Sequence, residues 1–386
     1  LSAASLLDDT PVDIPTVGGL YVPQNYDRRY HEVASVRTSL AGSLNIPAVR
    51  TLMLTGLQRF HERLRDVGLS SLGEAADFYG YSLALGSADV SLLELTNAYR
   101  TLASGGLQGS VTLRPRALEA RHRVLDARAA FIVGDILSDR GARSVTFGLR
   151  NELATSFWSA VKTGTSKDMR DNWCVGFSSH YTVGVWVGNF DGRPMWDVSG
   201  VSGAAPVWRD VMDYLHRDRA SRAPAPPSGL VRQAVVFHPE VEPPRTEWFV
   251  RGTETADVVL LAPGQRQPKI VYPVDGSLIA LDPDIPPHLQ RVRFQAQGAA
   301  GLDWVLDGAA PEAGVLEAGW APAPGKHDLT LVGQDGHTVA RARFEVRGAA
   351  PSQSVSTFST SSGGSSASST PVSTGAIGTN SGESER

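Results

Sequence analysis

The chain has 386 residues, of which 41% are hydrophobic, and this length and composition are typical of two folded domains with a tail. Its formal net charge of -4 at pH 7 gives no electrostatic reason to expect nucleic acid as a partner. The single cysteine, Cys174, excludes an intramolecular disulfide and a cysteine-rich metal site.

The amino terminus reads like the middle of a domain, because the chain begins at Leu1 and continues as LSAASLLDDTPVDIPT. No apolar stretch reaches the ~18 residues that would span a bilayer, and no signal peptide is visible. We therefore expect a truncated polypeptide, with any membrane anchor in a missing amino-terminal part.

Residues 30–140 are predicted to be mainly helical, because apolar residues recur there at helical spacing. Ser35 is a suitable N-cap, and Asn45 with Pro47 reads as the cap and first turn of a second helix. The predicted helices are Ser35 to Gly42, the segment from Asn45 onward, Leu57 to Val67, Leu92 to Leu102, and Asp126 to Ile136.

After Phe157 the pattern changes from helix to strand. The segments FWSAVKTGTS, NWCVGFSS and YTVGVWVGNF read as strands, and the polar turn at Ser179-His180 makes the last two an antiparallel hairpin. Helices, an antiparallel sheet and a closing helix predict an α+β domain over residues 1–216. The closing helix opens at Pro206, and its predicted apolar side holds Val207, Trp208, Val211, Met212 and Leu215.

The remainder of the chain divides into three parts by composition. Residues 217–267 are predicted to be a Pro-rich linker and an extended connector. Short alternating strands with Asp-Gly turns predict a small all-β sandwich over residues 268–347. Residues 348–386 are rich in Ser, Thr and Gly and have hardly any large apolar side chain, so we expect a disordered tail.

The most informative segment is Lys162-Thr163-Gly164-Thr165-Ser166. A cation, hydroxyls and a glycine on a strand edge can bind a carboxylate and let a substrate backbone approach closely. In serine acyl-transfer enzymes such an edge also offers a backbone N–H to the developing oxyanion. Taken alone, a Lys-Thr-Gly triplet is weak evidence, because chance matches in strands are common.

The second element is Ser43-Leu44-Asn45, at the predicted end of a helix. It places a hydroxyl that can relay protons beside an amide that can hold a substrate amide. The competing interpretation is that Asn45 merely caps the helix that continues through Pro47.

In this order the two triplets match two of the three motifs of the penicillin-recognising serine enzymes. Over about residues 15–347 the chain resembles class A penicillin-binding proteins. The segments SLNIPAVR, ALGSADVSLLELTNAYRTLASGG and VKTGTSKDMRDNWCVGFSSHYTVGVWVGNFDGRPM resemble their transpeptidase domain. VSGVSGAAPVW and PPRTEWFVRGTE resemble the 1C type, and residues 268–346 resemble its carboxy-terminal Ig-like domain.

The resemblance implies a penicillin-binding/β-lactamase-like fold and peptidoglycan stem peptides and β-lactams as ligands. It implies that Lys162, Thr163 and Ser166 bind the ligand carboxylate, that Gly164 keeps the edge open, and that Thr165 offers its backbone N–H to the oxyanion. Ser43 would join the proton relay and Asn45 would orient the acyl amide. No cofactor is implied, and the location would be the periplasmic face of the cytoplasmic membrane.

The nucleophile of that family, a Ser-x-x-Lys on a helix, is not found. The four lysines are Lys162, Lys167, Lys269 and Lys326. Only Ser159 stands three residues before a lysine, and it lies on a predicted strand, where residues three apart point to opposite faces. We therefore expect the parent to be a bifunctional glycosyltransferase and transpeptidase, and this polypeptide to be inactive alone. Loss of the helix bearing the serine should expose an apolar face and lower solubility.

Two other functions stay open. A serine β-lactamase shares both triplets but would lack the sandwich and the connector. A non-enzymatic cell-envelope module would bind a partner protein through the sandwich and use the transpeptidase half as a scaffold.

Several residues are given structural interpretations. Cys174 is expected to be a buried, inert thiol, and the nine histidines show no metal-ligand spacing, so no metal is assigned. We expect His180 and His337 to be solvated, and Arg170 and Asp171 to form a surface ion pair. The tryptophans expected in the core or the cleft wall are Trp186, Trp196 and Trp208.

Overall fold

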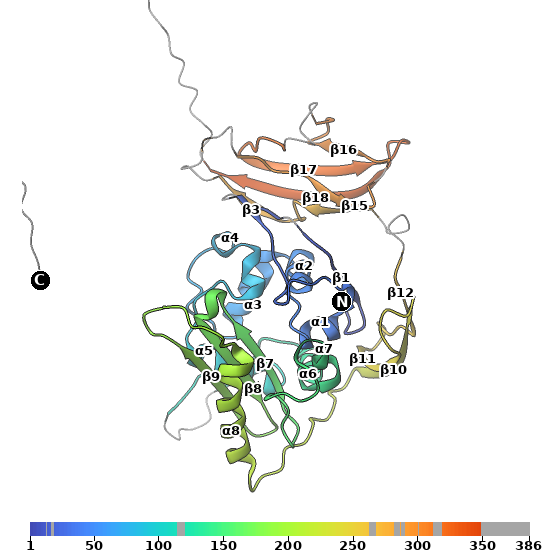
Figure 1. The fold of residues 1–386 in the computed structure, drawn as a ribbon. Coiled ribbons are helices and arrows are strands. Elements are labelled where there is room, and N and C mark those ends of the chain that lie inside the picture. Colours follow the sequence, from blue (N-terminus) through green and yellow to red (C-terminus); the bar gives the residue numbers. More distant parts are fainter. Residues whose placement is uncertain are drawn as a thin grey trace, which may run out of the picture. The chain divides into compact units, whose positions relative to one another are not determined.

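The computed structural model describes residues 1–12, 14–16, 19–113, 120–261, 268–281, 286, 290–299, 301–311 and 319–348. These residues form a mixed α/β structure (Figure 1). The predicted tail, apart from Gly348, lies outside them. Within the described residues, no helix is long and apolar enough to cross a membrane.

The amino-terminal part begins with two antiparallel strand pairs. Strand β1 (Leu6–Asp9) pairs with β4 (Glu32–Ser35), and β2 (Ile14–Thr16) pairs with β3 (Gly19–Tyr21). Helices follow, with a 3-10 helix at Tyr81–Leu85 and a strand pair formed by β5 and β6. Their bounds are α1 Val36–Ala41, α2 Asn45–Thr55, α3 Leu57–Asp66, α4 Ala76–Tyr79, α5 Leu92–Ala103, β5 Leu107–Gln108, β6 His122–Arg123, α6 Ala127–Ser138 and α7 Arg140–Phe147.

Local side-chain caps begin several of these helices, as predicted. The Ser35 hydroxyl accepts the Thr38 N–H at the start of α1, and Asp126 accepts the Arg128 N–H at the start of α6. The predicted cap at Asn45 is wrong, because Asn45 lies inside α2 and Leu44 occupies the N-cap position.

A three-stranded antiparallel sheet follows, in the order β7 (Ala160–Thr165), β8 (Asp171–Phe177) and β9 (Thr182–Gly188), so the predicted hairpin is confirmed. Helices α5 and α6 cover one face of this sheet. Helix α8 (Ala205–His216), preceded by a π-helical turn at Gly200–Ala204, packs on the other face (Figure 1).

The buried stripe of α8 is narrower than predicted. Trp208 and Met212 are fully buried against the sheet, whereas Val207 and Val211 are 48% and 38% exposed. The reason is that only positions near a four-residue spacing face the sheet, and Ala205 and His216 complete that stripe.

The segment predicted to be a linker and connector contains a sheet of its own. Strands β10 (Leu230–His238), β11 (Arg245–Val250) and β12 (Asp257–Val259) pair in the order β11-β10-β12. The alternating side chains of β10 and β11 bury one face, where Val235, Phe237 and Phe249 form a small core. We call residues 230–259 the connector sheet.

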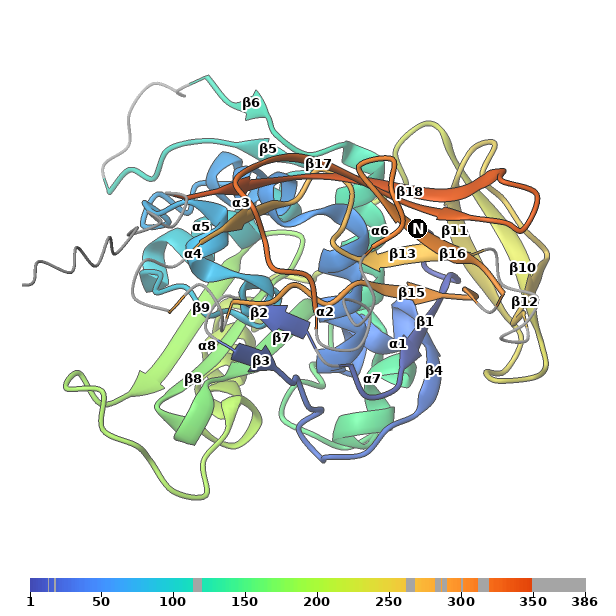
Figure 2. The ribbon, with the colours of Figure 1, turned by 90° about the horizontal axis from the view of Figure 1, so that it is seen from above.

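The carboxy-terminal part is all strands within the described residues (Figure 1 and Figure 2). A four-stranded sheet has the order β14-β18-β17-β16, and β13 pairs separately with β15. The predicted Asp-Gly turns are present, with positive φ at Asp307, Gly308 and Gly336. The strands are β13 Lys269–Tyr272, β14 Leu278–Ala280, β15 Gln295–Gln297, β16 Asp303–Leu306, β17 Gly325–Val332 and β18 Thr338–Arg347.

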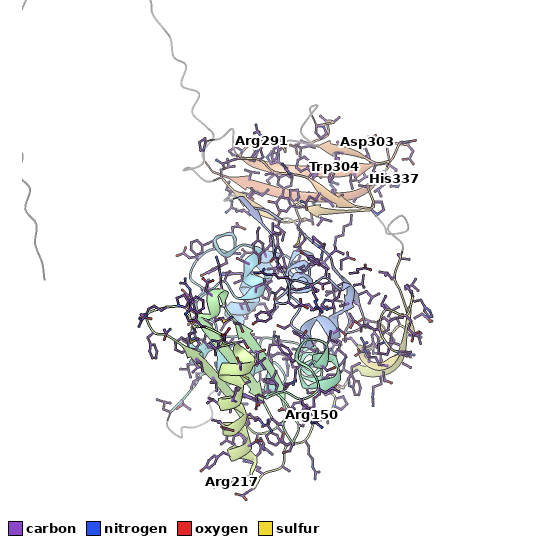
Figure 3. The ribbon with its side chains drawn as sticks, viewed as in Figure 1. Arg150, Arg217, Arg291, Asp303, Trp304 and His337 are labelled. Carbon is purple, nitrogen blue, oxygen red and sulfur yellow. The ribbon has the colours of Figure 1, made fainter. Side chains whose placement is uncertain are left out.

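Most of the structural interpretations of single residues are confirmed. Cys174 and Trp208 are fully buried, and Trp186 is half-buried. His180 is exposed in its turn, and His337 is exposed in the turn between β17 and β18, where Figure 3 labels it. The expectation for Trp196 is wrong, because it lies in the irregular segment after β9 and is 87% exposed.

Candidate active site

Two predicted site residues that lie 119 positions apart in the sequence meet in the structure. The Nζ atom of Lys162, on β7, donates a hydrogen bond of 2.6 Å to Oγ of Ser43 and one of 2.8 Å to the carbonyl of Thr163. A cation and a hydroxyl at this separation can exchange a proton directly.

The turn after α1 places Ser43. Gly42 caps the helix, and Ser43 adopts φ +60°, a left-handed conformation that is uncommon for serine. The hydroxyl of Thr146, on α7, donates a 2.6 Å hydrogen bond to the carbonyl of Gly42. A Cβ at Gly42 would lie 2.8 Å from the Thr38 carbonyl oxygen, so this close turn requires glycine.

Burial and a second cation set the protonation of Lys162. Desolvation, and then the nearby guanidinium of Arg143, lower the pKa of Lys162 to about 8. Arg143 is itself buried and donates to the carbonyls of Leu153 and Leu137. Lys162 can therefore lose its proton near neutral pH, which is what a proton relay to a hydroxyl requires.

Asn45 is held by a loop that precedes it. Its Nδ2 donates to the carbonyl of Gln24 at 2.8 Å, while its backbone N–H donates to Oδ1 of the buried Asn25 at 2.9 Å. The Nδ2 of Asn25 donates to both carboxylate oxygens of the fully buried Asp9 at 2.8 Å. Asp9 also accepts the N–H of His31. This chain of contacts orients the carboxamide of Asn45.

Sequence reasoning missed Asp9, Asn25 and His31. Each lies in a short irregular or edge segment, and no spacing connects it with Ser43-Leu44-Asn45. Their partners are set by the tertiary fold, so the sequence carried no local signal that could have found them.

Residues at the end of β7 form hydrogen bonds with later segments of the chain. Oγ1 of Thr165 accepts the Gly200 N–H at 2.9 Å, and the hydroxyl of Ser166 donates to Oδ2 of Asp171 at 2.8 Å. Asp171 also accepts Nε1–H of Trp186 at 3.0 Å. The structure thus engages one predicted carboxylate-binding hydroxyl, that of Ser166, with a partner within the protein, and it also engages the hydroxyl of Thr165, whose backbone N–H is the predicted oxyanion donor.

The predicted Arg170–Asp171 ion pair is wrong. Arg170 lies 3.5 Å from Asp168, in the turn between β7 and β8, and Asp171 uses its carboxylate on Ser166 and Trp186. The reason is that Asp171 is the first residue of β8, beside the end of β7, whereas Arg170 belongs to the turn.

A cavity of about 510 Å³ brings six of the seven predicted site residues together, and Ser166 follows them on the strand. The six lining residues are Ser43, Asn45, Lys162, Thr163, Gly164 and Thr165. Much of the remaining wall is apolar and comes from α1, α2 with its N-cap, α3, α7 and the 3-10 helix at Tyr81–Leu85. This apolar wall includes Leu40, Leu44, Pro47, Leu52, Phe60, Leu85 and Phe147.

All four lysines are described, and none lies on an α-helix. Lys162 is on β7, Lys167 is in a 3-10 turn, Lys269 is on β13 and Lys326 is on β17. Ser159 immediately precedes β7, and its buried hydroxyl is 2.9 Å from that of Thr155. Ser159 therefore lies on no helix, and it stands one residue before the strand on which it was predicted. In the described part of the chain, no group of three His, Cys, Asp or Glu residues could hold a metal ion.

Comparisons with known proteins agree with this fold. Residues 261–344 match the Penicillin-Binding Protein C-terminus Family. The chain is 32% identical to Penicillin-binding protein 1C of Escherichia coli (strain K12), covering 61% of this chain and 30% of that protein. It is 29% identical to Penicillin-binding protein 2D of Bacillus subtilis (strain 168), covering 68% and 40%. The predicted family resemblance is confirmed.

The fold is also that of a solved structure, Penicillin-Binding Protein 1A from Haemophilus influenzae. The match has a TM-score of 0.57 at 23% identity and covers 67% of this chain and 46% of that chain. This chain therefore spans less than half the length of each of these relatives.

Proposed function

We propose that this chain, a relative of the class A penicillin-binding proteins of the 1C type, is the D,D-transpeptidase portion of a bifunctional peptidoglycan synthase. The observation that carries the proposal is the 2.6 Å contact between Lys162 and Ser43 at a cavity that Asn45 also lines. The substrates would be peptidoglycan stem peptides, and β-lactams would take their place as inhibitors.

In the proposed reaction a serine hydroxyl attacks the carbonyl of the donor peptide and expels its terminal amine, which leaves an acyl-serine. An acceptor amine then attacks that ester and releases the serine. Lys162, neutral in part near pH 8, would accept and return protons through Ser43. Asn45 would hold the acyl amide.

The edge of β7 would bind the rest of the substrate. The backbone N–H of Thr165 would donate to the oxyanion. The ammonium of Lys162 and the hydroxyl of Thr163 would attract the carboxylate, with Gly164 leaving room for the peptide. Ser166 would contribute only after its hydroxyl turns away from Asp171, to which it now donates.

We further propose that this polypeptide does not become acylated by itself. None of its four lysines lies on an α-helix, where a Ser-x-x-Lys pair would bring the two side chains together. The apolar wall of the cavity, formed by residues such as Leu44, Leu52 and Phe147, would receive the serine-bearing helix of a longer polypeptide.

The carboxy-terminal strands fit the proposed Ig-like sandwich. Two sheets are present there, and residues 261–344 match the carboxy-terminal family. Cell-envelope proteins are the partners we propose for it, and the periplasmic face of the cytoplasmic membrane is the proposed location. The alternative function, a non-enzymatic envelope scaffold, is favoured only by the lack of a helix-borne lysine.

Fluorescent penicillin tests the proposal. The purified chain should give no covalent adduct by denaturing gel or intact mass. A longer polypeptide that also carries an upstream Ser-x-x-Lys segment should be labelled once per molecule. No labelling of the longer polypeptide would favour the scaffold, and a stoichiometric adduct on the shorter chain would overturn its proposed inactivity.

A further inference from the structure

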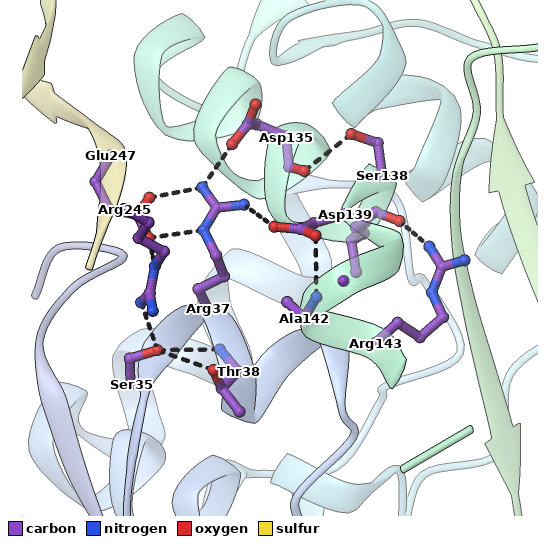
Figure 4. A network of polar contacts seen from close by, with 12 residues as sticks. Ser35, Arg37, Thr38, Asp135, Ser138, Asp139, Ala142, Arg143, Arg245 and Glu247 are labelled. Carbon is purple, nitrogen blue, oxygen red and sulfur yellow. Dashed lines mark hydrogen bonds and ion pairs between the residues drawn. The ribbon is translucent and has the colours of Figure 1, made fainter. Parts of the chain in front are cut away.

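The connector sheet is joined to the helical part of the site by a buried ionic contact (Figure 4). Arg37, on α1, is 5% exposed, and Glu247, on β11, is fully buried. Nε and Nη2 of Arg37 donate to the two carboxylate oxygens of Glu247 at 2.7 and 2.6 Å. This bidentate geometry fixes the orientation of the guanidinium as well as its position.

The remaining donors of Arg37 reach two other helices. Nη2 donates to Asp135 on α6 at 2.6 Å, and Nη1 donates to Asp139, the N-cap of α7, at 3.0 Å (Figure 4). A ring contact supports the same packing, with Phe131 of α6 edge-on to Trp248 of β11 at 5.4 Å between centroids. Three helices thus meet at the guanidinium of Arg37, and α1 and α6 also contact the connector sheet directly.

A second set of contacts holds the N-cap of the helix. Arg245 donates to Glu247 and Glu242 at 2.6 Å each and to the hydroxyl of Ser35 at 2.9 Å. Glu242 also accepts the backbone N–H of Ser35 at 2.6 Å. The N-cap and the second residue of α1 are therefore both held by residues 242–247.

The carboxyl end of α1 leads into the candidate site. The helix has only six residues, and the turn at Gly42 leads directly to Ser43. Helix α7 holds both ends, because Asp139 accepts from Arg37 and Thr146 donates to Gly42. Arg37 and Ser43 therefore lie near opposite ends of one short helix, both of which contact α7.

We propose that residues 242–247 act as a clamp that positions Ser43 against Lys162, with Arg37, Arg245 and Glu247 as positioning residues. A buried ion pair adds little net stability over apolar packing, so fixing a geometry is the role that this arrangement suits better. The clamp follows from the contacts alone, and only its effect on acylation rests on the proposed function.

Lysine NMR tests the clamp in the chain itself. With 13C-labelled lysine the four lysines give few signals, and the Lys162 signal is assigned by Lys162→Arg. In Glu247→Gln we expect the pKa of Lys162 to rise from about 8 toward its ordinary 10.5, because a loosened Ser43 turn admits water. Amide exchange over residues 38–43 should quicken at least about tenfold.

The matched control is Glu152→Gln. Glu152 also pairs with an arginine, Arg209, at 3.1 Å, but these two side chains are 47% and 39% exposed. This variant should leave the Lys162 titration and the exchange of residues 38–43 unchanged. If Glu247→Gln lowers the melting temperature but moves neither readout, the clamp is only a structural support and the inference is overturned.

A second variant covers a failure to fold. Arg37→Lys keeps the charge but loses the bidentate hydrogen bonds to Glu247. We expect a Lys162 pKa between those of the wild type and Glu247→Gln. An unchanged titration in this variant would also overturn the clamp.

Fluorescent penicillin applied to the longer polypeptide separates the two proposals. An unlabelled wild type contradicts the proposed function and leaves the NMR result standing. A labelled wild type, with Glu247→Gln labelled at the same rate, contradicts the clamp alone.

Discussion

Two cations are withdrawn from water to different degrees, since Lys162 is half-buried and Arg37 is buried, and they meet opposite surroundings. Lys162 has a hydroxyl and a carbonyl as its hydrogen-bond partners among the described residues, and the Arg143 charge nearby lowers its pKa further. Arg37 faces the carboxylates of Glu247, Asp135 and Asp139, and Glu247 and Asp135 raise its pKa. Burial alone disfavours both charges, so the partners decide the outcome.

The comparison separates a group that can move a proton from one that cannot. Desolvation and the nearby Arg143 lower the pKa of Lys162 to about 8, so a fraction of it is neutral near that pH, whereas a guanidinium surrounded by carboxylates stays charged and holds its geometry. The first suits chemistry and the second suits positioning. Substitutions of the two cations, and then of the uncharged Asn25, test this difference from the largest expected effect to the smallest.

Lys162→Arg should remove the proton transfer that we propose for Lys162. Arginine keeps a positive charge but does not lose its proton, so we expect acylation of the longer polypeptide by fluorescent penicillin to slow by roughly 10²–10⁴-fold. Single-turnover labelling measures the rate. The control is Lys167→Arg, which changes an exposed lysine in the turn after β7 and should label normally. Equal rates for Lys162→Arg and wild type would contradict a proton-relay role.

Arg37→Ala should remove the buried ion pair between Arg37 and Glu247. It leaves Glu247 buried without its main partner, and we expect a loss of about 3–5 kcal/mol in the free energy of unfolding. Arg209→Ala removes an arginine that is 39% exposed and paired with Glu152, and should cost about 0–1 kcal/mol. Urea unfolding measures both, and similar losses for the two variants would refute the difference between a buried and a surface pair.

The pH dependence of the free energy of unfolding should report the lowered pKa of Lys162. Since the pKa of Lys162 is lowered to about 8, the unfolded chain binds more protons than the folded one between pH 8 and the ordinary value near 10.5. Stability should therefore rise with pH across that window, by about 2–3 kcal/mol from this group. Lys162→Met should lack this part of the rise in urea unfolding at pH 7.5 and 10. A variant that keeps the full rise would show that another group titrates.

The sequence predicted the candidate site residues Ser43 and Lys162 far better than the buried contact of Arg37. Local signals such as the Ser35 cap, the alternation of Val183 and Val185, and the Asp-Gly turns act within a few residues, and the corresponding elements are present. The Ser43 and Lys162 segments could be found because each triplet is contiguous. Their mutual contact was implied only by the family resemblance.

The clamp could not be found in the same way. Arg37 and Glu247 are 210 positions apart, and nothing in the neighbourhood of either residue specifies the other. The run PPRTEWFV is predicted to be part of an extended connector, although its Glu247 and Phe249 alternate into a buried face. Long-range charge pairing is decided by the tertiary fold and leaves no periodicity.

Asn25→Ala addresses a third kind of burial, an uncharged side chain between two structural elements. Asn25 caps α2 from twenty residues upstream, since its Oδ1 accepts the N–H groups of Asn45 and Ile46 at 2.9 and 3.3 Å. Loss of this cap should cost about 0.5–2 kcal/mol in urea unfolding. The side-chain amide signal of Asn45 should also shift, because the loop that orients it is no longer tied to the helix.

Asn189→Ala is the matched control, because Asn189 donates to the carbonyl of Arg193 at 2.9 Å in a surface loop. It should change the free energy of unfolding by no more than about 0.5 kcal/mol and leave the Asn45 signal in place. If Asn25→Ala behaves like this control, the buried amide contributes no more than a surface one. Positioning of the site would then rest on the charged clamp rather than on the neutral contacts around Asn45.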